Sequence, residues 1–228
     1  MGEHFHLWRS SIWFDCRRYW MEERPSRIRY RPCAFGVTME ASLIADCTGA
    51  SMANAIRYAE HLTHAMDRFE INNRNRQAAF LATISVESMK LTKVEEGLYY
   101  KDPERLAKIY PRAFDNAQEA TPYARNPQAL GDLLYGGYWG RSPIQLTWEK
   151  NYKAASDAIG VDYVSNPDLL LEPEHGSMVA AWFWFANGCN APADRGDMKA
   201  VTRIVNGPAL MHLAERIEQF EKNLEVLP

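Results

Sequence analysis

Two glutamates nine residues apart, Glu87 and Glu96, have the residue types and spacing to perform acid–base chemistry. Glu87 follows Phe80, Leu81 and Ile84 at the spacing of one buried helical face, which places its carboxyl in a core-facing position. Burial disfavours the charged form of a carboxyl. Glu87 could therefore carry a proton near neutral pH, as a general acid must.

The helical pattern breaks after Glu87, and Glu95 and Glu96 follow in a loop that contains glycine and tyrosine. This loop should be more open to water, so a carboxylate there would stay ionised and could act as a general base. Most glutamates at the end of a helix are solvated or paired with a cation, and that remains the alternative from spacing alone.

Helices must position these residues, because capping signals and apolar periodicity recur along most of the chain. Ser51 is a candidate N-cap, and Thr147 is another. Helices are expected over 51–70, up to Glu87, from Asp102-Pro103 to about Tyr110, after Asn126-Pro127, from Thr147 to Gly160, over Ala180–Phe185, over Asp197–Val205 and over Leu210–Leu227. Ile56 belongs to the expected apolar stripe of the first helix, and Trp182 and Trp184 to the core. The fold class is mainly α.

Between residues 134 and 147 the helical pattern gives way to three glycines and Pro143, which exclude a regular helix. Tyr138 and Trp139 lie in this segment and offer flat aromatic surfaces on which a sugar ring could stack. Burial in the core is the other reading of Trp139.

Several segments resemble glycoside hydrolase family 19, the chitinase and phage-endolysin family. Its His-Glu-Ser run is matched by Val86-Glu87-Ser88, and its Glu-Asn-Leu-Asn-Tyr loop by residues 96–100. Its Gly-Arg-Gly-Pro-Ile-Gln-Leu-Thr segment is similar to residues 140–147, which lead to Asn151-Tyr152. The resemblance covers about residues 51–227.

The resemblance implies a lysozyme-like, two-lobed α-helical fold with a catalytic cleft and at most a small β-hairpin. It implies inverting cleavage of β-1,4 bonds between N-acetylated sugars, with Glu87 as acid, Glu96 as base and Thr147 holding the attacking water. Inverting enzymes keep the two carboxyls about 6.5 to 9.5 Å apart. The substrate-binding residues that it implies are Gln145, Asn151, Tyr138, Trp139, Tyr100, Asn206 and Arg216, and Arg216 is also expected to tune the carboxylates. No cofactor and no metal are expected.

The chain departs from the family pattern at several positions around the two glutamates. Val86 replaces histidine, and Gly97 and Tyr99 replace asparagines. Glu95 beside Glu96 leaves two candidates for the base, although only Glu96 keeps the Glu-x-Leu-x-Tyr spacing.

Composition predicts one catalytic domain, residues 39–228, after a basic extension, residues 1–38. The extension holds seven arginines against four acids and three of the seven tryptophans, so it could bind anionic envelopes or could be a poorly ordered or non-native start. No run reaches the roughly 18 apolar residues of a membrane span. The four cysteines have no zinc-site spacing and are expected to be free thiols.

Because no secretory signal is visible, a phage or prophage endolysin is the favoured function. Its substrate would be peptidoglycan, and a separate holin would release it from the host cytoplasm to the cell wall. A monomer that binds no nucleic acid is expected. The alternatives are a chitinase acting on chitin oligomers, a lytic transglycosylase that uses Glu87 alone, and a non-catalytic cell-wall-binding protein.

Overall fold

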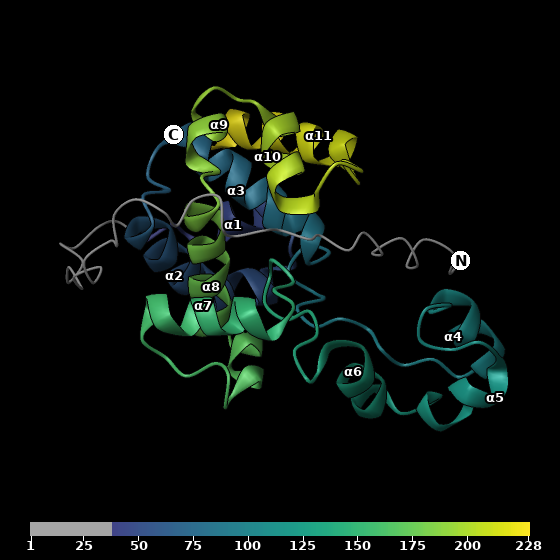
Figure 1. Ribbon diagram of the computed structural model, residues 1–228. Coiled ribbons are helices and arrows are strands. Elements are labelled where there is room, and N and C mark those ends of the chain that lie inside the picture. The colour runs from purple at the N-terminus through teal and green to yellow at the C-terminus, as the bar shows by residue number, and fades with distance from the viewer. Residues whose placement is uncertain (1–37) are drawn as a thin grey trace.

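The computed structural model describes residues 38–228 as an α-helical protein (Figure 1), so the basic extension lies outside the described residues except for Thr38. The helices are α1 (Ala41–Thr48), α2 (Met52–Arg68), α3 (Arg74–Glu87), α4 (Pro103–Ile109), α5 (Ala117–Ala120), η2 (Thr121–Tyr123), α6 (Pro127–Tyr135), α7 (Glu149–Ile159), η3 (Pro167–Leu171), α8 (Pro173–Ala186), α9 (Asn190–Asp194), α10 (Met198–Asn206) and α11 (Leu213–Val226). Extended pairing in this part of the chain is limited to two isolated bridges, Glu95 with Arg141 and Arg141 with Leu146. The mainly α fold class is confirmed.

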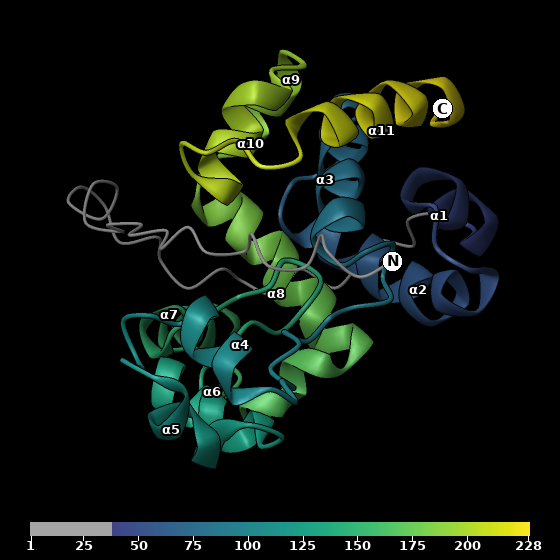
Figure 2. The same ribbon diagram turned by 90° about the vertical axis from the view of Figure 1, so that its right-hand side faces the viewer.

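The larger hydrophobic core surrounds α3 and α8, the two helices in the middle of the molecule (Figures 1 and 2). The side chains of Phe80, Leu81 and Ile84 on α3 are fully buried, as is Trp184 on α8. The rings of Phe80 and Trp184 meet edge to face, with 5.5 Å between their centroids. Because α3 packs against α11, α1 and α9, it is held from several directions.

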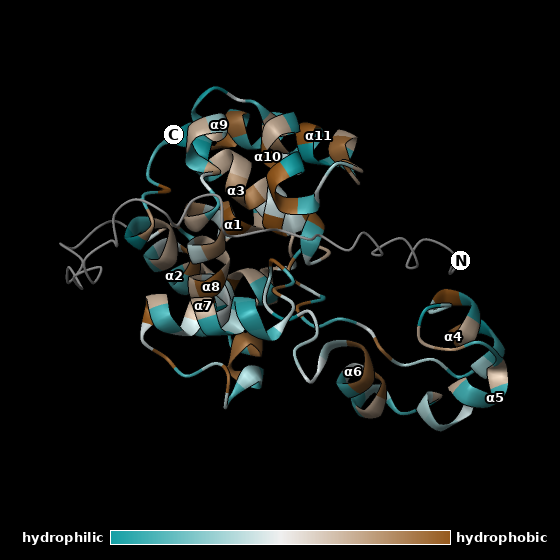
Figure 3. Ribbon diagram, viewed as in Figure 1, coloured by the Kyte–Doolittle hydropathy of each residue, from teal (hydrophilic) through white to brown (hydrophobic). Residues whose placement is uncertain are grey.

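A second, smaller core lies among α4, α5, α6 and the loops beside them, at the lower right of Figure 1. Its buried members are Leu98, Leu106, Tyr110, Phe114, Ala120, Leu130 and Trp139. The hydropathy colouring in Figure 3 shows brown segments on α4 and α6 within this region. Two separate cores agree with the expected two-lobed architecture.

Several helix starts show the N-cap chemistry that short polar side chains provide. Ser51, Asn73, Asp102, Asn126 and Asp197 each accept a hydrogen bond from a backbone N–H in the first turn of the helix that follows. Each cap is a local interaction. It gives a hydrogen-bond partner to a backbone N–H that would otherwise lack one.

Four details of the expected secondary structure were wrong. No helix was expected over Ala41–Thr48, which forms α1, and the last helix begins at Leu213 instead of near Leu210. The residue before α7 is Trp148, with no side-chain cap, so Thr147 is not the N-cap. Ile56 on α2 is 65% exposed, so it does not belong to the buried stripe of that helix.

No helix in the range 38–228 is long and apolar enough to cross a membrane. Cys47 and Cys189 are buried free thiols, as expected, whereas Cys16 and Cys33 fall outside the described residues.

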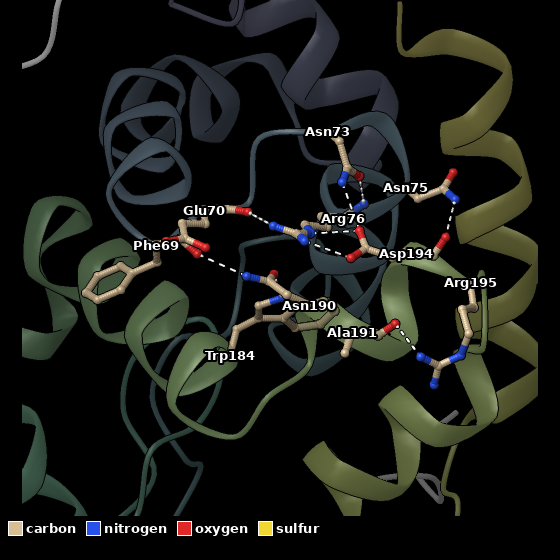
Figure 4. A network of polar contacts seen from close by, with 10 residues as sticks. All are labelled: Phe69, Glu70, Asn73, Asn75, Arg76, Trp184, Asn190, Ala191, Asp194 and Arg195. Atoms are coloured by element: carbon tan, nitrogen blue, oxygen red, sulfur yellow. Dashed lines mark hydrogen bonds and ion pairs between the residues drawn. The ribbon is translucent and has the colours of Figure 1, made fainter. Parts of the chain in front are cut away.

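Asp194, at the end of α9, fixes the start of α3 through a polar network (Figure 4). Its carboxylate accepts hydrogen bonds from Nε and Nη2 of Arg76, both at 2.7 Å, and from Nδ2 of Asn73 at 2.8 Å. The Asp194 backbone carbonyl accepts from Asn75 at 3.0 Å. The Arg76 hydrogen bonds, followed by the one from Asn73, lower the pKa of Asp194 from 3.8 to about 2.

Replacing Asp194 with asparagine should therefore lower the free energy of unfolding at pH 7. A depressed carboxyl pKa contributes stability that is present above the unfolded pKa, near 4, and is lost as the pH falls towards about 2. Since the Asp194 side chain is 37% exposed, the effect should be about 1 kcal/mol or less. Urea unfolding of both proteins from pH 7 down to pH 2 tests this. If the difference in free energy of unfolding between wild type and Asp194→Asn does not become smaller below pH 4, the prediction is wrong.

Candidate active site

Glu87 is the last residue of α3, and its position is buried as the sequence predicts, with 4% of the residue exposed. The helix that carries it is buried on more than one face, since α11, α1 and α9 pack against it. A carboxyl here can act only on an atom brought directly against the end of α3.

Arg216 on α11 forms a buried ion pair with Glu87, its Nη2 donating to Oε1. Arg216 is fully buried, and its Nε donates to the carbonyl of Met211 at 3.4 Å. Its Nη1 finds no hydrogen-bond partner among the described residues. Arg216 therefore lies directly against Glu87, the proximity that the family resemblance implies.

Glu96 lies in the loop after α3, residues 93–97, called here the Glu96 loop. Its Oε1 accepts a hydrogen bond from the hydroxyl of Tyr135 at 2.7 Å, and its Oε2 accepts from the backbone N–H of Gly140 at 3.1 Å. Burial raises the pKa of Glu96, although both hydrogen bonds oppose the rise. The expectation of an open, solvated carboxylate is therefore wrong for Glu96, which is half-buried.

Glu95 differs from Glu96 in exposure and in partner. Glu95 is exposed, and its Oε1 accepts a hydrogen bond from the indole N–H of Trp139 at 3.0 Å. The two neighbouring carboxylates thus have separate partners, and only Glu96 is shielded from water to a large extent.

The glycine-rich segment folds back on itself and against the Glu96 loop. Arg141 and Leu146 exchange both backbone hydrogen bonds, at 3.1 and 2.7 Å, and the Glu96 N–H donates to the Gly140 carbonyl at 2.8 Å. A Cβ at Gly140 would lie 2.8 Å from Oε1 of Gln145, so a side chain there would displace the Gln145 amide. It would lie 3.4 Å from Oε2 of Glu96, which shows how closely the Gly140 backbone approaches that carboxylate.

Gln145 and Thr147 lie in the same turn. Nε2 of Gln145 donates to the carbonyl of Lys93 at 3.0 Å, which ties the turn to the Glu96 loop. The Thr147 hydroxyl donates to the Gln145 carbonyl at 3.0 Å, and Nδ2 of Asn151 donates to the Thr147 carbonyl at 2.7 Å. All three expected site residues are therefore connected to one another, while their contacts with a sugar or a water remain predictions.

Among the aromatic residues expected to stack on sugars, Trp139 is buried, whereas Tyr100 and Tyr138 are half-buried. Trp139 is 7% exposed, and the Arg141 guanidinium lies 3.7 Å from the centroid of its ring. The hydroxyl of Tyr138 donates to the carbonyl of Val164 at 3.3 Å, and the hydroxyls of Tyr100 and Tyr110 lie 3.3 Å apart. These rings pack against protein in the structure, which matches the core reading of Trp139.

Asn206 closes α10 and is 7% exposed. Its Oδ1 accepts from the backbone N–H of Met211, the residue whose carbonyl accepts from Nε of Arg216. Asn206 thus supports the turn that contacts Arg216, and whether it also contacts a substrate stays a prediction.

Three residues that the sequence did not single out contribute to the site. Tyr135 contacts Glu96, and the buried Arg141 organises the glycine-rich segment. Trp148 is 42% exposed with its ring edge-to-face on Tyr135 at 5.2 Å, and its φ of +77° is rare for a bulky side chain. The glycines and proline near Tyr135 and Trp148 predict an irregular segment. They do not predict which of its side chains contact Glu96.

A hollow of about 500 Å³ opens between α4 and α5, lined by residues such as Lys108 and Phe114. None of its lining residues is a predicted site residue, and the two glutamates identify the site better than this hollow does. No group of three His, Cys, Asp or Glu side chains within 38–228 is placed to hold a metal ion.

A buried glutamate at the end of α3 and a half-buried glutamate on the next loop are the two carboxyl groups that a glycoside hydrolase requires. The family model "Chitinase class I" of the glycoside hydrolase 19 family matches residues 51–202. The chain belongs to glycoside hydrolase family 19.

Plant endochitinases are among the relatives of this chain. "Acidic endochitinase SP2" of Beta vulgaris is 34% identical over 137 residues, 60% of this chain and 41% of that protein. "Acidic 27 kDa endochitinase" of Solanum lycopersicum is 44% identical over 64 residues, 28% of this chain and 26% of that protein. The chain thus spans less than half the length of these curated relatives.

Two solved structures share the fold. Chitinase C from Streptomyces griseus HUT6037 is 23% identical, with a TM-score of 0.56, over 84% of this chain and 93% of that one. A bacterial family 19 chitinase is 25% identical, with a TM-score of 0.55, over 83% of this chain and 95% of that one.

Proposed function

We propose that this protein hydrolyses β-1,4 bonds in glycans of N-acetylated sugars, with inversion, and that chitin oligosaccharides are the first substrate to test. One observation carries the proposal: a family 19 chain holds one glutamate buried against an arginine and a second, half-buried glutamate on the loop that follows. The named relatives, which are chitinases, support chitin ahead of the peptidoglycan that the sequence alone favoured.

Glu87 is the proposed general acid. It donates its proton to the oxygen of the leaving sugar as the glycosidic bond breaks. The carboxylate that remains is stabilised by the Arg216 guanidinium, which already contacts Oε1. Because both side chains are buried, water is excluded, and the attraction between the two charges is stronger than it would be in solvent.

Glu96 is the proposed general base. Each of its oxygens accepts one hydrogen bond from the protein, and each carboxylate oxygen can accept two. A water can therefore bind with the carboxylate fixed in place, lose a proton to it and attack the anomeric carbon. The Thr147 hydroxyl is proposed to orient this water, while Gln145, Asn151 and Asn206 would bind hydroxyl or acetamide groups.

Tyr135→Phe should move the acidic limb of the kcat/KM profile to higher pH. The Tyr135 hydrogen bond lowers the pKa of Glu96, so its loss lets burial raise that pKa further. A base works only when deprotonated, and activity should then fall at a higher pH than in the wild type. Tyr123→Phe, which removes a hydroxyl from another half-buried tyrosine, is the matched control. Superimposable acidic limbs for wild type and Tyr135→Phe would refute the role of this contact.

The substrate is tested by incubating wild type and Glu96→Gln with chitin oligosaccharides and with purified peptidoglycan, and by resolving the products by mass spectrometry. Hydrolysis of chitin oligosaccharides that Glu96→Gln abolishes is the expected result. Cleavage of peptidoglycan alone would favour an endolysin. Anhydro-sugar products that survive Glu96→Gln would indicate a lytic transglycosylase, and binding without product a wall-binding protein.

A further inference from the structure

We propose that Glu95 is a positioning residue: the indole of Trp139 holds its side chain and so fixes the register of the Glu96 loop, leaving Glu96 to face the substrate. This inference rests on the proposed function, in which Glu96 is the base. It gives a separate role to the carboxylate that competes with Glu96 for that assignment.

The two side chains leave the loop in different directions. Glu95 takes part in the isolated bridge with Arg141, and neighbouring side chains of an extended segment point to opposite sides. Glu95 accordingly contacts Trp139, whereas Glu96 contacts Tyr135 and Gly140. A shift of the loop by one residue would exchange the two carboxylates.

Trp139 is rigid enough to serve as the anchor. Its ring fits against Gly131 of α6, where an added Cβ would lie 2.4 Å from Cε3 of the indole. The Arg141 guanidinium covers the ring at 3.7 Å, and the Trp139 carbonyl accepts from the Tyr152 hydroxyl at 2.8 Å. The indole N–H therefore points in one direction, towards Glu95.

Arg141 is itself held, so the anchor does not depend on a mobile cation. Its Nη1 donates to the Gly137 carbonyl and to the Tyr152 hydroxyl, both at 3.2 Å, and its Nη2 pairs with Asp168 at 2.9 Å. The side chain is 1% exposed. A continuous set of contacts thus runs from the buried Arg141 through Trp139 to Glu95.

The backbone next to the anchor completes the link to Glu96. Gly140 follows Trp139 directly, and its carbonyl and N–H bind the backbone N–H and Oε2 of Glu96. Releasing Glu95 from Trp139 would leave these two contacts as the remaining direct hydrogen bonds between the loop and residues 139–140. The Glu96 carboxylate would then sample more orientations.

The test compares Glu95→Gln, Glu95→Ala and Trp139→Phe in steady-state hydrolysis of chitin oligosaccharides. Glutamine keeps an oxygen that can accept from the indole, so Glu95→Gln should stay within about threefold of the wild-type kcat. Glu95→Ala and Trp139→Phe remove the hydrogen bond and should each lower kcat about tenfold or more, with KM little changed. Because both remove the same contact, the double variant should be no worse than the poorer single one.

The pH profile adds a readout that a loss of general stability would not move. A loosened Glu96 carboxylate loses part of the hydrogen bonding that lowers its pKa, so the acidic limb of Glu95→Ala should move to higher pH and that of Glu95→Gln should not. Glu221→Ala, which truncates an exposed glutamate on α11, is the control for removing a surface carboxylate. Thermal melts check that each variant is folded.

Two results would overturn the inference. Wild-type kcat and an unmoved acidic limb in both Glu95→Ala and Trp139→Phe would remove the positioning role and leave the proposed function intact. An inactive Glu95→Gln beside an active Glu96→Gln would make Glu95 the base. Failure of the proposed function itself is separate, because it would appear as a wild-type protein that gives no hydrolysis product.

Discussion

Glu87→Gln should lower kcat on chitin oligosaccharides by about 10²- to 10⁴-fold, the range that a positioned proton donor contributes. The amide cannot protonate the leaving oxygen, but its carbonyl oxygen can still accept from Nη2 of Arg216, so the packing at the end of α3 is kept. KM should change little, because the substitution preserves size and removes an interaction that matters mainly in the transition state.

Hydrolysis of an aryl glycoside separates the role of the acid from that of the base. A phenolate leaves with little protonation, so the Glu87→Gln defect should shrink on such a substrate, whereas a defect at Glu96 should persist because water must still be activated. Glu218→Gln, an exposed change on α11, is the matched control and should retain full activity. Glu87→Gln turnover above a tenth of wild type on chitin oligosaccharides would contradict the assignment of the acid.

The positions that sequence patterns located well are those decided by local chemistry. Ser51 caps α2 because its side chain accepts a hydrogen bond from the N–H of Asn54 three residues on, and Glu87 is buried because it follows Ile84 at helical spacing on α3. Trp184 is buried because its helix is hydrophobic nearly all round. Each of these conclusions needs only the residues of one helix.

The contacts that decide the chemistry join residues far apart in the chain. Arg216 meets Glu87 across 129 residues, and Tyr135 meets Glu96 across 39. No periodicity carries that information, so a solvated loop was expected where the structure gives a half-buried carboxylate. The burial of Trp139 depends on distant residues too, because its ring is covered by Arg141, whose inward direction depends on Asp168 and Tyr152.

The capping error at Thr147 has a more local cause. Threonine is a good N-cap, but its hydroxyl donates to the Gln145 carbonyl within the tight turn of the glycine-rich segment. Gln145 and Trp148 on either side both have positive φ, with values of +56° and +77°. A backbone that adopts such conformations at bulky residues is held there by tertiary contacts, and such positions are concentrated at functional sites.

Arg216→Met should lower the free energy of unfolding by about 3 to 5 kcal/mol, the usual cost of removing one partner from a buried ion pair. Methionine has a comparable length and fills much of the space, so the main loss is electrostatic. Glu87, with 2% of its side chain exposed, would be left in the core without its cation. Urea unfolding at pH 7 measures the loss, and Arg203→Met, an exposed change on α10, should cost far less.

The double variant Glu87→Gln/Arg216→Met separates the ion pair from general packing. A neutral amide needs no counter-ion, so the double variant should recover part of the stability that Arg216→Met loses, and the two changes should not add. Additive losses would mean that Arg216 acts through packing alone. Since the pair is shielded from solvent, raising the salt concentration should leave the difference between wild type and Arg216→Met nearly unchanged. Salt sensitivity would place the pair in water and would remove the proposed basis for stabilising the Glu87 carboxylate during catalysis.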